Sequence, residues 1–291
     1  MIYQFQLGHF RCTICSDGQM KPPWEPPWEE FFGVDTGVSD TALAAALAEE
    51  ESHRAGLALG YNCLCVETGN ETVIIDTGLG RNFQGYGPEL SVHLGKLGPA
   101  LAYANFSTSD ISIVILTHLH QDHVRGALWS GELTFPHAKH IVHTTEVAFW
   151  RDGLERAENA DHAAVVTSAL ALFDRQLQAV PYGCEVVPGI RTIAASGHTP
   201  GHMGILVHSD GHQLLCVGDL FYDSLQLRRP DWWTRYDLDP RQSVHTRLEL
   251  AAWAANEGLL VHAYHMPFPG IGRIRRNGRA FEWQALGTIY Q

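Results

Sequence analysis

The chain has 291 residues, of which 45% are hydrophobic and 18% are charged, a composition typical of a globular protein with a large core. Its formal net charge of −12 disfavours binding to nucleic acids or to anionic membranes, because both are negatively charged. The sequence contains no apolar run long enough to cross a membrane and no signal peptide, so we expect a soluble, cytoplasmic protein.

Short runs rich in Val, Ile and Leu alternate with longer helical stretches along the chain. The pattern predicts strands at residues 2–7, 10–16, 62–68, 72–76, 111–116, 140–143, 184–187, 192–195, 203–208, 213–217 and 259–263. It predicts helices at residues 40–52, 90–104, 144–152, 162–179 and 240–256. Each half is β-rich and then helical, which indicates one internally duplicated domain over residues 1–291.

A segment rich in proline and tryptophan occupies about residues 21–35. Its four prolines exclude regular structure, because proline fixes φ and lacks a backbone donor. We expect a loop near the N-terminus. Its Trp24 and Trp28 would line a pocket rim or a subunit contact, or would simply pin the loop to the surface.

Histidine is unusually frequent, with 17 residues, and several lie in tight clusters. The apolar run at 113–116 is followed by Thr-His-Leu-His-Gln-Asp-His, which contains His118, His120, Asp122 and His123. In extended backbone His118 and His120 point to the same side, so one cation can bind both, while Asp122 and His123 can face a second cation. Desolvating four such side chains is costly without a metal or hydrogen bonds, so we expect a metal site.

Three further predicted strands also lead into metal-binding residues. The strand at 192–195 leads to His198 and His202, the strand at 213–217 to Asp219, and the strand at 259–263 to His265. Ligands converge at such strand ends in layered α/β folds. This recurrence indicates that the separate segments build one site.

Together these residues resemble the metallo-β-lactamase superfamily. The resemblance rests on His-x-His-x-Asp-His at 118–123, Gly-His-Thr-Pro-Gly-His at 197–202, Gly-Asp at 218–219, the late His265 and Ile-Asp-Thr-Gly at 75–78. It extends from about residue 61 to residue 283. It implies an α/β fold, a four-layer αββα sandwich with a dinuclear metal site at one edge of the two sheets.

The resemblance also implies a role for each residue of the site. One ion would be held by His118, His120 and His198, the other by Asp122, His123 and His265, with Asp219 as the bridge. Asp76 and His202 would orient these ligands through hydrogen bonds, although Asp76 could instead only cap the following turn. Both ions would be divalent; zinc is favoured, and manganese, cobalt or iron would fit the same ligand types.

A hydrolase is the activity that this resemblance implies, with a bridging hydroxide as the nucleophile and Asp122 as a proton carrier. The likeness is strongest to the methyl parathion hydrolase and N-acyl homoserine lactone lactonase group, through Phe-Pro-Gly-Ile-Gly at 268–272 and Glu-Val-Ala-Phe-Trp at 146–150. Tyr222 stands where the lactonases carry a tyrosine that contacts the lactone. It favours a catalytic role on a lactone or other ester with an apolar acyl or aryl group; simple packing is the alternative.

Two other activities remain open at this stage. One is hydrolysis of phosphotriesters (an organophosphate hydrolase), and the other is a di-iron oxidoreductase on the same ligand set. Oxygen-reducing members of the superfamily usually replace the second histidine of the first motif by glutamate, so His120 favours hydrolysis.

The remaining expectations concern the substrate and partners. Trp150, His162 and Phe268 are candidates for the substrate pocket. We expect a small-molecule substrate, no nucleic-acid or membrane partner, and a homodimer, the last from the resemblance and from the Pro/Trp-rich loop.

Overall fold

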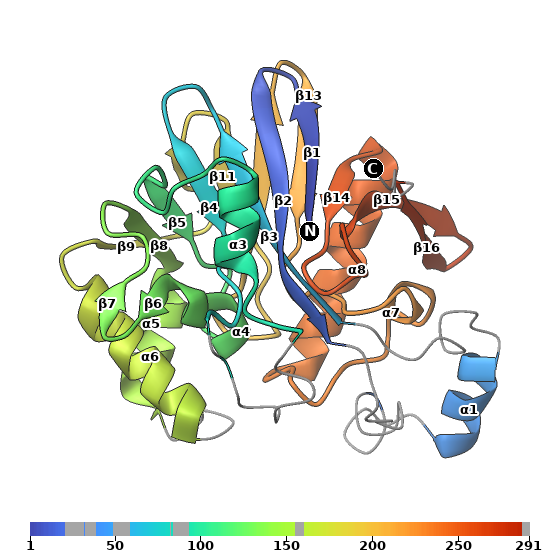
Figure 1. Ribbon diagram of the computed structural model, residues 1–291. Coiled ribbons are helices and arrows are strands. Elements are labelled where there is room, and N and C mark those ends of the chain that lie inside the picture. Colours follow the sequence, from blue (N-terminus) through green and yellow to red (C-terminus); the bar gives the residue numbers. More distant parts are fainter. Residues whose placement is uncertain are drawn as a thin grey trace.

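Two seven-stranded sheets pack face to face in the computed structural model, which describes residues 1–20, 32, 39–48, 59–81, 83, 93–154 and 160–286 (Figure 1). The first sheet has the order β1-β2-β3-β4-β5-β8-β9. Its strands are β1 (Ile2–Leu7), β2 (Phe10–Met20), β3 (Leu59–Glu67), β4 (Thr72–Ile75), β5 (Ile113–Ile115), β8 (Lys139–His143) and β9 (Leu177–Val180). Strands β1 to β4 pair antiparallel, whereas β4, β5, β8 and β9 pair parallel.

The second sheet has the order β10-β11-β12-β13-β14-β15-β16. Its strands are β10 (Glu185–Val187), β11 (Ile190–Ala194), β12 (Met203–Ser209), β13 (His212–Cys216), β14 (Leu260–His262), β15 (Ile271–Asn277) and β16 (Ala280–Ala285). Only the pair β13–β14 is parallel in this sheet, as far as the described residues extend. A short hairpin of β6 (Leu128–Trp129) and β7 (Glu132–Leu133) stands apart.

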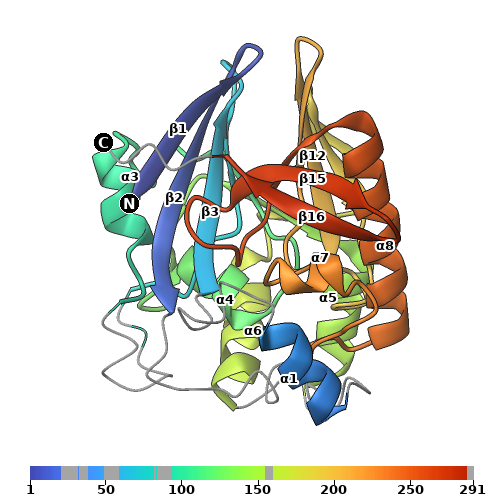
Figure 2. The same ribbon diagram turned by 90° about the vertical axis from the view of Figure 1, so that its right-hand side faces the viewer.

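Helices cover the outer face of each sheet, which is seen edge-on in Figure 2. The first sheet is covered by α3 (Leu97–Tyr103), α5 (Thr144–Asp152) and α6 (Ala160–Phe173), and the second by α8 (Pro240–Glu257). Shorter elements are α1 (Asp40–Ala48), α4 (Gln121–Val124), a 3-10 turn at Arg125–Ala127, and α7 (Leu225–Arg228). The four layers confirm the predicted αββα sandwich. None of the described helices is both long and apolar enough to span a bilayer.

Apolar side chains fill all three spaces between these layers. The space between the sheets holds Ile14, Leu64, Ile75, Ile205 and Leu214, each almost completely buried. Strand β5 is buried on both faces, which explains its uninterrupted apolar sequence. The rigid sandwich therefore fixes the strand ends from which the polar clusters emerge.

Two of the predicted helices are shorter than expected. The helix predicted at 90–104 begins only at Leu97, because Gly95 is left-handed (φ +71°) and the Asp17 carboxylate accepts the Leu97 N–H at 2.9 Å; residues 90–92 lie outside the described residues. The helix predicted at 162–179 ends at Phe173, and the chain then continues into β9.

Several other boundaries differ from the predictions, and some elements were missed. The β15–β16 hairpin, β6–β7 and the short helices α4 and α7 were not predicted, and β2 continues to Met20. The end of the helix predicted at 40–52 and the Pro/Trp-rich loop at 21–35 lie outside the described residues, apart from the buried Phe32.

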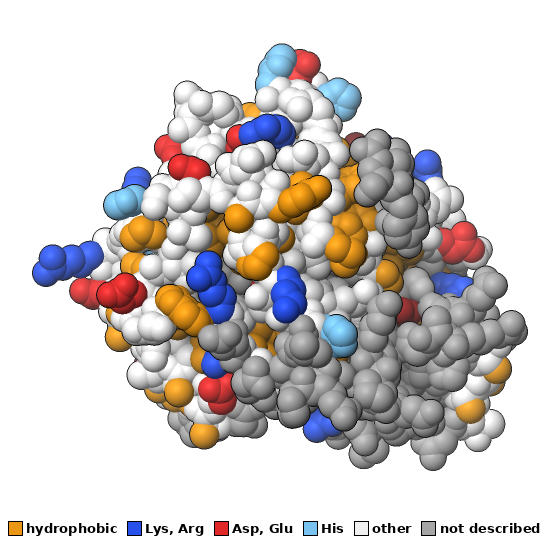
Figure 3. Space-filling model, in the orientation of Figure 1, with side chains coloured by type: hydrophobic (Ala, Val, Ile, Leu, Met, Phe, Trp, Pro, Cys, Tyr) orange, Lys and Arg blue, Asp and Glu red, His pale blue; other side chains and the backbone are white. Residues whose placement is uncertain are grey.

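Hydrophobic side chains reach the surface on the face formed by β1, β2 and α3 (Figure 3). Tyr103 of α3 is 78% exposed, and Met1 is 63% exposed. The predicted homodimer stays a prediction.

Candidate metal centre

The predicted metal-binding residues meet at one edge of the sandwich, where strands of both sheets end. His118, His120 and the short helix α4 follow β5, while His198, Asp219 and His265 follow β11, β13 and β14. The parallel strands β4 and β5 deliver their carboxyl ends to the same edge. The centre therefore draws residues from both halves of the chain.

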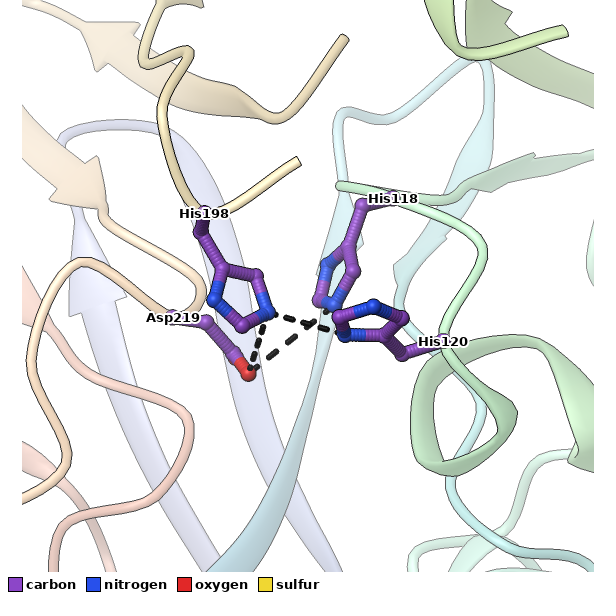
Figure 4. A group of neighbouring side chains, drawn as sticks. All are labelled: His118, His120, His198 and Asp219. Carbon is purple, nitrogen blue, oxygen red and sulfur yellow. Dashed lines mark hydrogen bonds and ion pairs between the residues drawn. The ribbon is translucent and has the colours of Figure 1, made fainter. Parts of the chain in front are cut away.

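Three histidines and one aspartate form the first group, in which the side chains point toward one another (Figure 4). Their ligand atoms all lie within 4.8 Å of one another. His198 Nε2 lies 2.9 Å from His120 Nδ1 and 3.4 Å from Asp219 Oδ2, and His118 Nε2 lies 3.9 Å from the same oxygen.

Asp122, His123 and His265 form the second group. His265 Nε2 lies 3.4 Å and His123 Nε2 3.6 Å from Asp122 Oδ2. Asp219 also faces this group, with Oδ1 3.0 Å from His123 Nε2 and Oδ2 3.2 Å from His265 Nε2. Asp219 therefore lies between the two groups, in the position proposed for a bridge.

Unpaired polar atoms test whether the residues fit metal ions. Within the described part of the chain, His118 Nε2, His123 Nε2 and Asp219 Oδ1 are buried without a hydrogen-bond partner. His123 Nε2 and Asp219 Oδ1 face each other at 3.0 Å. Buried polar atoms without partners are costly, and atoms that converge on one point are satisfied by a cation. The donor set, five imidazoles and two carboxylates, suits zinc or a related divalent ion.

The histidines of the centre differ in protonation: nearby carboxylates outweigh burial and raise the pKa values of His123 and His198, whereas His118 and His120 are neutral before an ion binds. Burial, reinforced by neighbouring histidines, lowers the pKa values of His118 and His120 well below the ordinary value. Both rings are therefore neutral near pH 7. Metal coordination requires the neutral imidazole.

Asp76 lies behind His123. Its Oδ2 lies 3.0 Å from His123 Nδ1, and its Oδ1 accepts the backbone N–H of Thr117 at 2.8 Å. Asp76 has a left-handed backbone (φ 58°), which asparagine and aspartate tolerate better than other side chains. On the other side of the ring, Nε2 of His123 faces Asp219; the supporting role of Asp76 stays a prediction.

His202 supports Asp219 rather than a metal ion. Its Nδ1–H donates to the Ala195 carbonyl at 2.8 Å, and its Nε2 accepts the Asp219 N–H at 3.2 Å. Burial lowers the pKa of His202 to about 4, so the ring stays neutral and can accept this bond. A Cβ at Gly218 would lie 2.4 Å from His202 Nε2, which explains the glycine before Asp219.

The loop that carries His265 is fastened to β3 of the opposite sheet. His265 Nδ1–H donates to the Gly60 carbonyl at 3.0 Å, and the Gly60 N–H donates to the His265 carbonyl at 2.9 Å. The Asn62 amide donates to the carbonyls of Tyr264 and Met266 at 2.9 and 2.7 Å. This pairing joins the two sheets directly beneath the second group.

A buried glutamate, the first residue of the motif at 146–150, links the two histidine loops, a role that the sequence did not predict. Glu146 is 0% exposed and accepts four hydrogen bonds at 2.7–3.0 Å. The donors are the N–H groups of Leu119 and Gly201, the Trp150 indole and the Thr199 hydroxyl. It thereby fixes the loop of His118 and His120 against the loop of His198.

Asp237 is a second contributor that sequence reasoning missed. Its Oδ1 accepts the His198 Nδ1–H at 3.1 Å, and the fully buried Arg247 lies 3.8 Å from its Oδ2. Neither residue belongs to a local motif, so no signal in the sequence marked them.

Tyr222 reaches the centre with its hydroxyl. The phenol donates to Asp219 Oδ2 at 2.9 Å, and the ring stacks on His265 with centroids 4.7 Å apart and planes 13° apart. Burial and the charge of Asp219 raise the pKa of Tyr222 well above its ordinary value, so the phenol keeps its proton.

The three predicted pocket residues take supporting positions. Trp150 is 1% exposed, with its ring against His120 and its N–H on Glu146, and His162 is fully buried with Nε2 bonded to the Leu119 carbonyl. Phe268 packs against the core between the sheets. All three residues pack around the centre, and their predicted contact with substrate stays a prediction.

The chain is similar to known proteins in both sequence and structure. The family model described as "Metallo-beta-lactamase superfamily" matches residues 56–252. Protein YobT of Bacillus subtilis (strain 168), of uncharacterised function, is 29% identical over 164 residues, and an N-acyl homoserine lactonase of Bacillus sp is 24% identical over 160 residues. These matches cover 55% and 51% of this chain and 61% and 58% of the relatives, so they span about three fifths of the relatives' length.

Solved structures match over nearly the whole chain. The hydrolase AbOPH of the beta-lactamase superfamily has a TM-score of 0.84 at 26% identity, covering 98% of this chain and 97% of that one. AidC, a dizinc quorum-quenching lactonase in complex with a product, has a TM-score of 0.86 at 22% identity with the same coverage. With the family match over most of its length, this chain belongs to the metallo-β-lactamase superfamily.

Proposed function

We propose that the protein is a dinuclear metal-dependent hydrolase that opens lactones or cleaves other esters with an apolar acyl or aryl group. The observation that carries the proposal is the hydrogen bond from the Tyr222 hydroxyl to Asp219. It places a neutral hydrogen-bond donor beside both groups of candidate metal-binding residues. The lactonases among the similar proteins support the same substrate class.

His118, His120 and His198 would hold one ion and Asp122, His123 and His265 the other, with Asp219 between them. When bound, two divalent ions would polarise the ester carbonyl and lower the pKa of a bound water to about 7. The Tyr222 hydroxyl has a single hydrogen, which is bonded to Asp219. It would turn from Asp219 to donate a hydrogen bond to the substrate oxygen. The side chain of Asp122 is 16% exposed, against 2% for Asp219, so it can exchange a proton with solvent.

The test combines metal analysis with hydrolysis assays. We expect about two zinc ions per chain, and turnover of an N-acyl homoserine lactone in preference to methyl paraoxon. Tyr222→Phe keeps the ring on His265 and removes only the hydroxyl, so lactone kcat should fall about tenfold, the effect of one hydrogen bond, with the zinc content unchanged. Asp219→Ala is the control that should lose both metal and activity.

Other outcomes would change the proposal. Preferred hydrolysis of methyl paraoxon, unaffected by Tyr222→Phe, would assign a phosphotriesterase. Iron as the main metal, with no ester hydrolysis, would assign the oxidoreductase alternative.

A further inference from the structure

Asp237 and Arg247 form a buried pair behind His198. Asp237 Oδ1 accepts the His198 Nδ1–H at 3.1 Å, and Oδ2 accepts the Thr234 N–H at 3.0 Å. The Asp237 side chain is 0% exposed and that of Arg247 is 1% exposed, with Nη2 of Arg247 3.8 Å from Oδ2. An arginine is seldom buried this deeply unless its donors are used.

The guanidinium of Arg247 organises the segment between Asp219 and Asp237. Its Nε donates to the Leu220 carbonyl at 2.6 Å, and its Nη1 donates to the carbonyls of Trp232 and Pro230 at 2.6 and 3.0 Å. Leu220 directly follows Asp219. Arg247 therefore holds the segment near both of its ends: beside Asp219, the proposed bridge, and before Asp237, the partner of His198.

We propose that Asp237 and Arg247 are positioning residues that set the metal affinity of the group formed by His118, His120 and His198, separately from the other group. The inference rests on the proposed metal centre. A carboxylate on Nδ1–H directs the Nε2 lone pair of His198 into the centre and makes the ring more basic. The second group has its own carboxylate, because Asp76 Oδ2 lies 3.0 Å from His123 Nδ1.

Zinc titration against a chromophoric chelator tests this separation, because it yields one dissociation constant for each ion. An asparagine at 237 has one oxygen and one NH₂, so it cannot accept from both His198 and Thr234. Asp237→Asn should weaken one constant by about 10- to 100-fold, and Asp76→Asn should weaken the other. Arg247→Lys keeps the charge but loses the planar fork, and should weaken the same constant as Asp237→Asn.

The matched control is Asp239→Asn. Asp239 lies two residues away and caps α8 through the Gln242 N–H at 3.0 Å, a role that asparagine fills equally well, so both constants should stay unchanged. The proposal is overturned if Asp237→Asn changes neither constant, changes both equally, or changes the same one as Asp76→Asn.

A second measurement needs no variant. In ¹⁵N-histidine NMR spectra of the zinc-loaded wild type, assigned through ring-to-backbone correlations, His198 should carry its proton on Nδ1; a proton on Nε2 overturns the inference. Fewer than two zinc ions in the wild type would refute the dinuclear centre itself. Two bound zinc ions without ester hydrolysis would refute only the proposed function, and the affinity test would remain decisive.

Discussion

Replacing Glu146 by glutamine should loosen the link between the two histidine loops. The carboxylate accepts the Leu119 N–H and the Trp150 indole on Oε1, and the Thr199 hydroxyl and the Gly201 N–H on Oε2. In glutamine one oxygen becomes NH₂. Two of the four donors then face another donor, whichever way the amide is turned.

The size of the effect follows from these contacts. Hydrogen bonds to a charged group contribute about 1.5–3 kcal/mol each, so losing two costs about 3–6 kcal/mol. Burial raises the pKa of Glu146, and a neutral amide relieves part of that desolvation cost. We expect Glu146→Gln to lower the free energy of unfolding by about 3 kcal/mol, which leaves a domain of ordinary stability folded.

Urea denaturation followed by circular dichroism, on metal-loaded and metal-free protein, measures this difference. The control is Glu249→Gln on α8, where the side chain is 66% exposed and pairs with His245 at 3.3 Å; it should change stability by less than about 0.5 kcal/mol. A loss below about 1 kcal/mol for Glu146→Gln would refute the reasoning that this carboxylate joins the loops.

Three further predictions concern pH, metal and backbone. Burial raises the pKa of Asp17 to about 7, so between about pH 4 and pH 7 the folded chain holds a proton that the unfolded chain has lost. In urea melts, the free energy of unfolding of the wild type, minus that of Asp17→Asn, should therefore fall from pH 4.5 to pH 7.5. A difference that does not change with pH would contradict this. Removing metal with EDTA should lower the thermal midpoint, because ions that bind only the folded state stabilise it; an unchanged midpoint in the zinc-loaded protein would count against the centre. A Cβ at Gly126 would lie 1.8 Å from the Thr77 carbonyl oxygen, so Gly126→Ala should lower the free energy of unfolding, measured by calorimetry, by at least about 1–3 kcal/mol. A variant as stable as the wild type would show that the backbone shifts to make room.

The residues that meet at the candidate centre were predictable because their signals are local. A buried apolar strand followed by histidines and aspartates is visible within about ten residues, as at His118 and His120. Glu146 and Asp237 leave no such trace, because the loop residues that they hold lie far away along the chain. Leu119 and Gly201 are 27 and 55 positions from Glu146, and His198 is 39 positions from Asp237. The hairpin β15–β16 escaped prediction because Ile271–Asn277 is buried only in its first half and ends in exposed arginines.

The pocket residues were predicted from motif likeness, and that role stays a prediction. Trp150 occupies the position expected from the motif. Its indole N–H donates to Glu146, and its ring packs against His120. Sequence patterns indicate which residue stands at a position. Which face of that residue is left for substrate depends on contacts made across the fold.

The fastening of His265 to β3 has a consequence for how the protein is made. The second group joins Asp122 and His123 to a residue that is translated long after them, and its loop is held by Gly60 from the first sheet. An ion bound there would close a chain loop of more than about 100 residues, which restricts the unfolded ensemble as a long-range crosslink does, by about 4–5 kcal/mol. Newly synthesised chains must therefore wait until residue 265 has emerged before this half of the centre can capture its ion.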